Sequence, residues 1–389
     1  MSNMKATEIK KGIYWVGAID WNLRNFHGYL TQRGSTYNAY LIIDEKITLV
    51  DSVKSYLTDE MLKRISTIID PSKIDTIICN HVEMDHSGAI PKIVELNPAA
   101  KVYASPKGVS GLKAHYKKDW NFVEVKSGDV INLGKRNLHF LLTPMVHWPD
   151  NMVAYLAEDK ILFSNDAFGQ HLASSERFDD EYPLDIIMEE ARKYYANIVL
   201  PYSSQVVKAL DDALKLDIEV IANSHGIIWR KHIPEIIREY RDWSSNTLDK
   251  KVLIVYDTMW GSTEKIANAI YDAFEQKGYR IYKYCLQDNH ISDIMTEVLN
   301  AEYVCVGSPT LNKSILPSVA GFLTYLQGLS PKNRKTILFG SYGWAKQNIK
   351  EMERYMTESE FQIVHTVNVN YIPGEEELLA IRNEVLEKI

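Results

Sequence analysis

The pattern of hydrophobic and polar positions divides the chain into two halves. In the second half, apolar strand-like runs alternate regularly with helical patterns, beginning with VLIVYDT at 252–258. Five strands and five helices follow one another in this way, which predicts a doubly wound parallel five-stranded sheet. The expected strands lie at 252–257, 280–285, 302–307, 335–340 and 362–371. The expected helices begin at 263 and near 291, 316, 346 and 375.

The first half has a different pattern, in which apolar and polar positions alternate in short runs. Examples are YNAYLII at 37–43 and NLHFLLT at 137–143, which predict half-buried strands. Helical patterns such as LTDEMLKRISTII at 57–69 come between some of them, so this half is a mixed α/β layer structure. The polar segment YRDWSSNTLDKK at 240–251 has no period. We therefore expect two domains, residues 1–249 and 250–389.

Composition narrows the class of protein. The net charge of −7 and the lack of a basic block argue against a nucleic-acid surface. The opening MSNMKATEIKKG has no apolar segment and no later run is long enough to span a membrane, which predicts a cytoplasmic protein. Cys79, Cys285 and Cys305 are far apart and predict free thiols. If the chain moves electrons, a centre other than a cysteine cluster must carry them.

Three loops of the second half are candidates for ligand binding, because they follow the first, third and fourth strands of a parallel sheet. Hydroxyl side chains and free backbone N–H groups at the start of the first helix would hold a phosphate, and two loop tryptophans would stack on a flat aromatic ligand. A single loop of this kind is more often an ordinary helix cap. The candidate residues are Thr258, Met259, Trp260, Gly261, Ser262, Thr263, Ser308, Pro309, Thr310, Leu311, Asn312, Ser341, Tyr342, Gly343, Trp344 and Ala345.

Ionisable residues gather after strands of the first half. The stretch HVEMDHSGAI at 81–90 follows an apolar strand and precedes a helix expected near Ser87. A lone residue of this type is usually a solvated loop residue or a cap, but clustering weakens that interpretation. The candidate metal ligands are His81, Glu83, Asp85, His86, His147, Asp166 and His225. Four imidazoles and three carboxylates suit two metals that share one carboxylate, whereas one zinc would need only three or four of them.

The chain resembles a known family. The motif H-x-E-x-D-H at 81–86 is similar to the zinc signature of the metallo-β-lactamase superfamily, with Glu83 in place of a histidine, and the second half resembles flavodoxins. Together the halves resemble the flavodiiron proteins over essentially the whole chain. The resemblance implies an N-terminal metallo-β-lactamase-like αββα sandwich, FMN in the second domain and two non-haem irons. It assigns His81, Glu83 and His147 to one iron, Asp85, His86 and His225 to the other, and Asp166 to the bridge; in some relatives, water replaces His86.

The resemblance also implies an activity. FMN would pass electrons to the diiron centre, which would reduce O2 to water, NO to N2O, or both. The donor would be rubredoxin, a reduced deazaflavin or a reductase using NAD(P)H. The chain would form a head-to-tail homodimer or a dimer of such dimers. His27, His171 and Tyr195 are candidates to line the substrate pocket, with packing or capping as the competing interpretation for each.

Glu83 bears on which metal is bound. A carboxylate in place of imidazole adds negative charge and a harder donor, which favours iron over zinc and redox chemistry over hydrolysis. Two alternatives stay open at this point. One is a binuclear zinc hydrolase with an FMN-binding accessory domain. The other is an electron carrier or redox sensor whose metal site is only structural.

Overall fold

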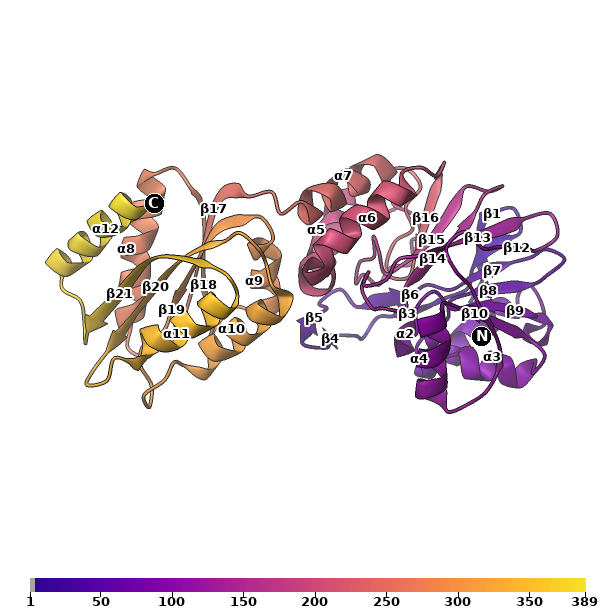
Figure 1. Cartoon of the computed structure of the whole chain (residues 1–389), viewed down its shortest axis with the longest axis horizontal. Helices are drawn as coiled ribbons and strands as arrows, with labels where there is room; N and C mark the ends of the chain where they lie inside the picture. The colour runs from indigo at the N-terminus through magenta and orange to yellow at the C-terminus, as the bar shows by residue number, and fades with distance from the viewer. Residues whose placement is uncertain (1–3) are drawn as a thin grey trace. The chain divides into compact units, whose positions relative to one another are not determined.

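The computed structural model describes residues 4–389, which form two compact units (Figure 1). One unit contains the chain up to Tyr194 together with Ser204–Arg241. The other contains Tyr195–Ser203 and Asp242–Ile389. The domain boundary expected near residue 249 stays a prediction. Within residues 4–389, no helix has the length and apolar character needed to cross a membrane.

The first unit is built on two main sheets. The seven-stranded sheet has the order β1 (Thr7–Lys10), β2 (Ile13–Trp15), β7 (Tyr40–Ile42), β8 (Thr48–Val50), β9 (Thr76–Ile78), β10 (Lys101–Ala104) and β11 (Asn121–Glu124). The five-stranded sheet has the order β12 (Val130–Asn132), β13 (Asn137–Leu142), β14 (Met152–Leu156), β15 (Ile161–Asn165) and β16 (Val220–Asn223). Two small pairs complete it: β3 (Ala18–Asp20) with β6 (Ser35–Tyr37), and β4 (Asn25–Phe26) with β5 (Tyr29–Leu30).

The two main sheets pack face to face, and helices cover their outer faces. Alternate residues such as Ile42, Phe140 and Phe163 form the shared core between the sheets. On the outer side of the first sheet, residues such as Met61 and Leu112 join a second core. The helices are α1 (Thr58–Ile65), α2 (Met84–Ser87), α3 (Ile90–Leu96), α4 (Pro106–Tyr116), α5 (Leu184–Tyr194), α6 (Ser203–Ala213) and α7 (Ile233–Ser244). The expected αββα sandwich is confirmed.

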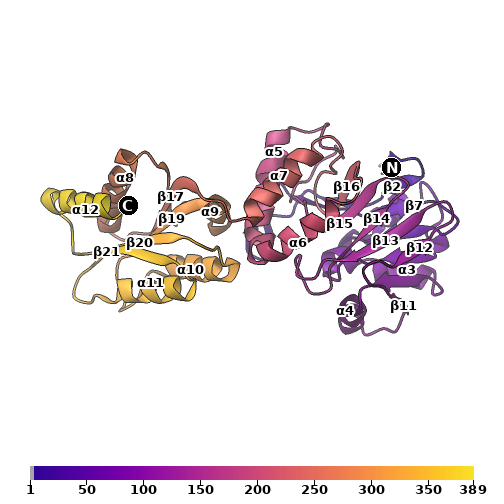
Figure 2. The same cartoon turned by 45° about the horizontal axis from the view of Figure 1, so that its top comes forward.

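The second unit is the expected parallel sheet. Its strands lie in the order β18 (Arg280–Cys285), β17 (Asp249–Tyr256), β19 (Ala301–Gly307), β20 (Lys335–Tyr342) and β21 (Gln362–Asn370). Its helices are α8 (Ser262–Gln276), α9 (Ile291–Val298), α10 (Pro317–Leu329), α11 (Gln347–Glu358) and α12 (Glu375–Lys388). Helices α8 and α12 pack together on one face of the sheet, and α9 to α11 cover the other (Figure 2). The fully buried run Val252–Tyr256 fits a strand covered on both faces.

Candidate functional site

The HVEMDHSGAI stretch forms a strand-to-helix connection after β9. The helix expected near Ser87 begins earlier, as the single turn α2. Its first turn closes because the backbone N–H groups of His86 and Ser87 donate to the Glu83 carbonyl at 3.0 and 2.9 Å. Asp85 and His86 therefore lie on a helical turn rather than in an open loop, and both are buried. Helix closure gives their side chains fixed directions.

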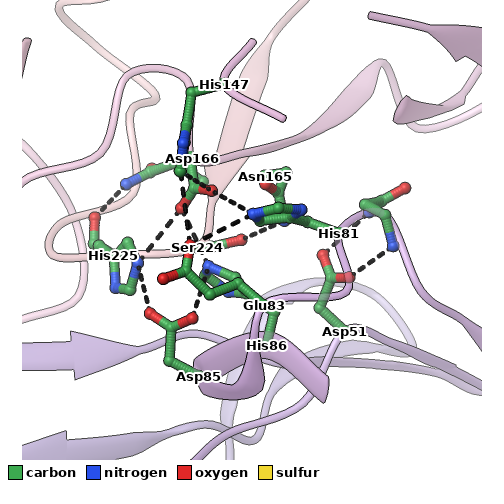
Figure 3. A network of polar contacts seen from close by, with 12 residues as sticks. Asp51, His81, Glu83, Asp85, His86, His147, Asn165, Asp166, Ser224 and His225 are labelled. Carbon is green, nitrogen blue, oxygen red and sulfur yellow. Dashed lines mark hydrogen bonds and ion pairs between the residues drawn. The ribbon is translucent and has the colours of Figure 1, made fainter. Parts of the chain in front are cut away.

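The other candidates come from strand ends of the second sheet. Asp166 directly follows β15, His225 comes two residues after β16, and His147 lies in the loop after β13. Strands β15 and β16 run parallel, so their carboxyl ends share one edge of the sheet. Figure 3 shows the side chains converging there with those of the first sheet. The structure thus brings together all seven predicted ligands.

The candidates form two groups around Asp166. In the first, Asp166 Oδ2 lies 3.8 Å from His81 Nε2 and 3.3 Å from His147 Nε2. Glu83 Oε2 adds a second carboxylate there, 3.4 Å from His81 Nε2 and 3.6 Å from His147 Nε2.

The second group uses the other oxygen of the same carboxylate. Asp166 Oδ1 lies 3.0 Å from His86 Nε2 and 3.2 Å from His225 Nε2. The two oxygens of Asp85 lie 3.4 and 3.3 Å from the same two ring nitrogens. Asp166 therefore presents one oxygen to each group, which is the arrangement of a carboxylate that bridges two metal ions (Figure 3).

The donor atoms fit two metal ions. Among the described residues, His81 Nε2, His86 Nε2, both Asp85 oxygens and Asp166 Oδ2 are buried without a hydrogen-bond partner. Buried polar atoms are normally paired, so such a concentration requires another partner. Within each of the two groups, the ligand atoms lie within 4.8 Å of one another, which is close enough for them to share a metal ion. Nitrogen and carboxylate oxygen donors of this kind suit iron or zinc.

Burial and mutual charge set the electrostatics of the cluster. Burial alone would raise the pKa of the Asp166 carboxyl, but the charge on His86 and the close ring nitrogens of His147 and His225 hold that pKa well below its usual value. Burial likewise opposes the charged form of His225, but the negative carboxylates of Asp166 and Asp85 beside its Nε2 raise its pKa to about 10. The carboxylates thus stay ionised and attract cations, and bound metal ions would replace the histidine protons.

Three residues that support the ligands were not predicted from the sequence. Asp150 Oδ2 accepts a hydrogen bond from His81 Nδ1 at 2.9 Å, and the Thr36 carbonyl faces His225 Nδ1 at 2.9 Å. The Tyr194 hydroxyl donates to Asp166 Oδ1 at 3.0 Å. Hydrogen bonds on the far ring nitrogen turn Nε2 of His81 and His225 towards the cluster.

The predicted pocket residues have different positions. His27 Nε2 lies 3.2 Å from Glu83 Oε1, and its side chain is 74% exposed. His171 is buried beside the cluster, with its ring 5.0 Å from that of His225. Burial, followed by the charge on His225, lowers the pKa of His171 well below its usual value.

Tyr195 belongs to the second compact unit, as does Ser203, whose hydroxyl lies 3.0 Å from that of Tyr195. The tyrosine that contacts the cluster is Tyr194, and a role for Tyr195 in the substrate pocket stays a prediction. Neighbouring residues at the end of α5 point in different directions, so the two rings do not share one face.

The second unit has a cavity of about 720 Å3 at the carboxyl ends of its strands. This volume falls in the range typical of cofactor sites. Trp260 and Trp344 border it and are 89% and 91% exposed, so both indole rings lack cover from this chain. The predicted residues that line the cavity are Thr258, Met259, Trp260, Ser262, Pro309, Thr310, Asn312, Ser341, Tyr342, Gly343, Trp344 and Ala345. Lys313, Tyr371 and Ile372 also line it and were not predicted.

Some predicted residues do not line this cavity. The Ser308 hydroxyl donates to the Pro309 carbonyl and accepts from the Leu316 N–H, so it holds its own loop. Leu311 pairs with Ser314 in a backbone bridge. Gly261 has a φ of +82°, which favours glycine at the turn into α8. Thr263 lies buried at the start of α8.

The cavity fits a phosphorylated flat aromatic ligand. Thr263 Oγ1 and Thr310 Oγ1 are buried without a partner among the described residues. Thr263 lies in the first turn of α8, where free N–H groups favour an anion. The exposed indole rings supply faces on which a ring system can stack.

The sequence and the structure are similar to those of known proteins. Residues 36–226 match the family described as ODP family beta lactamase, and residues 254–384 match Flavodoxin. The chain is 45% identical to a nitric oxide reductase of Moorella thermoacetica, over 95% of this chain and 94% of the relative. It is 42% identical to a rubredoxin-oxygen oxidoreductase of Megalodesulfovibrio gigas, with the same shares covered. It is 40% identical to a coenzyme F420H(2) oxidase of Methanothermobacter marburgensis, over 96% and 95%.

A solved structure decides the family. The crystal structure of the flavodiiron protein from Giardia intestinalis matches with a TM-score of 0.95 and 34% identity, over 99% of this chain and 96% of that one. The chain belongs to the flavodiiron proteins. This flavodiiron protein is therefore an oxidoreductase, and its cofactors are FMN and a non-haem diiron centre. The comparisons support this function over the binuclear zinc hydrolase.

Proposed function

We propose that this flavodiiron protein reduces O2 to water, NO to N2O, or both. The observation that carries the proposal is the position of Asp166, whose two oxygens face two separate groups of histidines. A site of this form holds two metal ions close enough for one diatomic molecule, or two, to bind between them. Relatives named for oxygen and nitric oxide chemistry support both substrates.

The ligand assignment is part of the proposal. One iron would be held by His81, Glu83 and His147, and the other by Asp85, His86 and His225. Asp166 would bridge the two, in line with the distances from its two oxygens. When bound, FMN and the iron pair supply electron storage and redox-active binding of the gas.

The residues around the metal ligands position and shield them. The Tyr194 hydroxyl donates to Asp166 Oδ1, which fixes the orientation of the bridging carboxylate. The Ser35 hydroxyl lies 2.8 Å from His171 Nδ1 and holds that ring in place. The rings of Phe26 and Tyr29 lie 4.8 and 5.1 Å from that of His171. Phe26, Tyr29 and His171 thus form an aromatic cluster beside the His225 ring.

The flavin assignment rests on the cavity of the second unit. The first turn of α8, with Ser262 and Thr263, would hold the FMN phosphate. Trp260 and Trp344 would flank the ring system. Lys313 and Tyr371 line the same cavity and would complete the site.

The donor, the assembly and the compartment are also proposals. Rubredoxin and a reduced deazaflavin are the two candidate donors, supported by the names of two relatives. A head-to-tail homodimer would bring FMN of one subunit to the diiron centre of the other. The cytoplasmic location and the domain boundary near residue 249 stay predictions from the sequence.

A comparison of gases and donors tests the function. Protein purified without added metal should contain two irons and one FMN per chain. Turnover is then measured with O2 and with NO, using reduced rubredoxin and reduced deazaflavin in parallel. Two zincs and no iron per chain would refute the proposal, and so would reduced holoprotein that consumes neither gas.

A further inference from the structure

The first unit contains an apolar cavity that the metal cluster does not use. It lies on the outer face of β13 to β15, beneath α6 and beside α7, and Figure 2 shows α6 against these strands. Leu141, Val153 and Leu162 form its floor, and Val206 and Leu210 of α6 form its roof. Its volume is about 40 Å3. One water-sized probe needs roughly 10–15 Å3, so the space is sufficient for a diatomic molecule and too small for a cofactor or a peptide side chain.

Two of the polar groups at this cavity, the hydroxyls of Ser164 and Tyr240, take part in hydrogen bonds within the chain. The Ser164 hydroxyl donates to the Ala167 carbonyl at 2.8 Å. The Tyr240 hydroxyl accepts the Phe168 N–H at 2.6 Å. Most of the lining side chains are apolar, and apolar cavities take up apolar guests such as xenon.

The cavity ends at the segments that carry two metal ligands. Val146, which lines it, directly precedes His147, and Ala167, which also lines it, directly follows Asp166. The surface beside Glu83 is instead polar, since the His27 side chain there is 74% exposed and contacts the Glu83 carboxylate. The apolar cavity thus adjoins the chain segments of two ligands, His147 and Asp166, and Glu83 is not among the residues that line it.

A surface groove adjoins the cavity on its other side. The groove has a volume of about 410 Å3 and shares Leu141, Val153 and Leu216 with the cavity lining. Asp212 and Lys215 border it and form an exposed ion pair at 2.6 Å. These three shared side chains lie between the groove and the cavity, and side-chain rotamer changes are much faster than collective domain motions.

We propose that this cavity holds the diatomic gas on its way from the surface groove to the diiron cluster. The proposal rests on the proposed function, because O2 and NO are small apolar molecules that prefer such a space to water. Val146 and Ala167 form the inner end of this path, and Leu216 forms the outer end. The cavity raises the local concentration of gas at the ligands while water and ions are excluded.

Xenon tests the cavity without any turnover. Crystals of the protein pressurised with xenon should show an atom between α6 and the β13–β15 face, and 129Xe exchange in solution should report the same site. Ala209, which faces the cavity from α6, offers a way to fill it. Ala209→Phe should abolish xenon binding, and Ala213→Val is a milder variant on the same lining. Val207→Phe is the matched control, because Val207 lies on the same helix and is 39% exposed.

Stopped-flow oxidation of chemically reduced holoprotein measures the path itself. Ala209→Phe should lower the second-order rate constant with O2 or NO roughly tenfold, equivalent to an added barrier of about 1.4 kcal/mol. The rate at saturating gas and the FMN and iron contents should stay at the wild-type level, and Val207→Phe should match wild type throughout.

The possible failures are distinguishable. Wild-type protein that reacts with gas but binds no xenon would overturn the cavity proposal and leave the proposed function intact. A filled cavity with an unchanged second-order rate constant, in Ala209→Phe or in Ala213→Val, would do the same. Reduced holoprotein that binds xenon but reacts with neither gas would refute the proposed function, and with it the identity of the occupant.

Discussion

Asp150 provides a direct test of how the cluster is assembled. Its Oδ2 atom accepts hydrogen bonds from His81 Nδ1 at 2.9 Å and from the Val82 N–H at 2.8 Å. Asp150→Asn keeps the shape of the side chain but removes its charge. The bond to His81 then loses its charge-assisted character, so the ring is held less firmly and its Nε2 becomes a weaker ligand.

The expected loss follows from these contacts. Removing a carboxylate that supports a metal-binding histidine typically lowers metal affinity roughly 10–100-fold, or about 1.4–2.8 kcal/mol. The loss should fall on the iron that we propose is held by His81, Glu83 and His147. The other iron should keep its affinity, because His225 is oriented by the Thr36 carbonyl at 2.9 Å rather than by Asp150.

Anaerobic titration of metal-free protein with ferrous iron measures both affinities. Wild type should fill two iron sites. Asp150→Asn should fill one site at the same iron concentration as wild type, and the second site only at a higher iron concentration. Asp159→Asn is the control, since Asp159 pairs with Arg136 at 2.7 Å, outside the cluster. Two irons bound by Asp150→Asn with wild-type affinities would refute the reasoning.

Three further perturbations test other parts of the site. Glu83→His should lower iron occupancy and gas turnover while the FMN spectrum stays intact, because imidazole is a softer, neutral donor; unchanged oxidase activity would contradict this. Thr263→Ala should raise the dissociation constant of FMN, since a hydrogen bond to a charged group contributes about 1.5–3 kcal/mol, and Thr263→Ser should retain it. Equal fluorescence titrations for both variants would count against the phosphate assignment. Removal of iron with a chelator should lower the thermal midpoint of unfolding. If free iron was a thousandfold above its Kd before removal, the lost free energy of stabilisation is about 4 kcal/mol. A midpoint that does not change with iron would show that iron binding does not stabilise the fold.

The sequence predicted the second unit nearly element by element. Runs such as Val252–Tyr256 are apolar throughout because both faces of the strand are covered. When helical patterns alternate with such runs, the sequence predicts a parallel sheet. The candidate metal ligands could be found for a related reason, since each lies shortly after an apolar strand and parallel strands end at one edge.

The supporting residues could not be predicted in this way. Asp150 meets His81 across 69 residues of chain, a pairing set by the packing of the two sheets. Tyr194 and Tyr195 are adjacent in the chain. Which of the two side chains faces the cluster depends on the backbone direction where α5 ends and a π-helical turn begins. Tyr371 joins the flavin cavity only because β21 ends beside β20. In each case the tertiary fold determines which residue reaches the site, and the hydrophobic periodicity of the sequence does not encode this.

The order of the ligands along the chain bears on how iron enters during synthesis. The group containing His81, Glu83 and His147 has its last carboxylate once Asp166 has left the ribosome, whereas the other group waits for His225. His225 follows β16, the last strand of the second sheet along the chain, so the second group requires a nearly finished sandwich. Loading of the second iron would therefore come late in synthesis, after the first group of ligands is already complete.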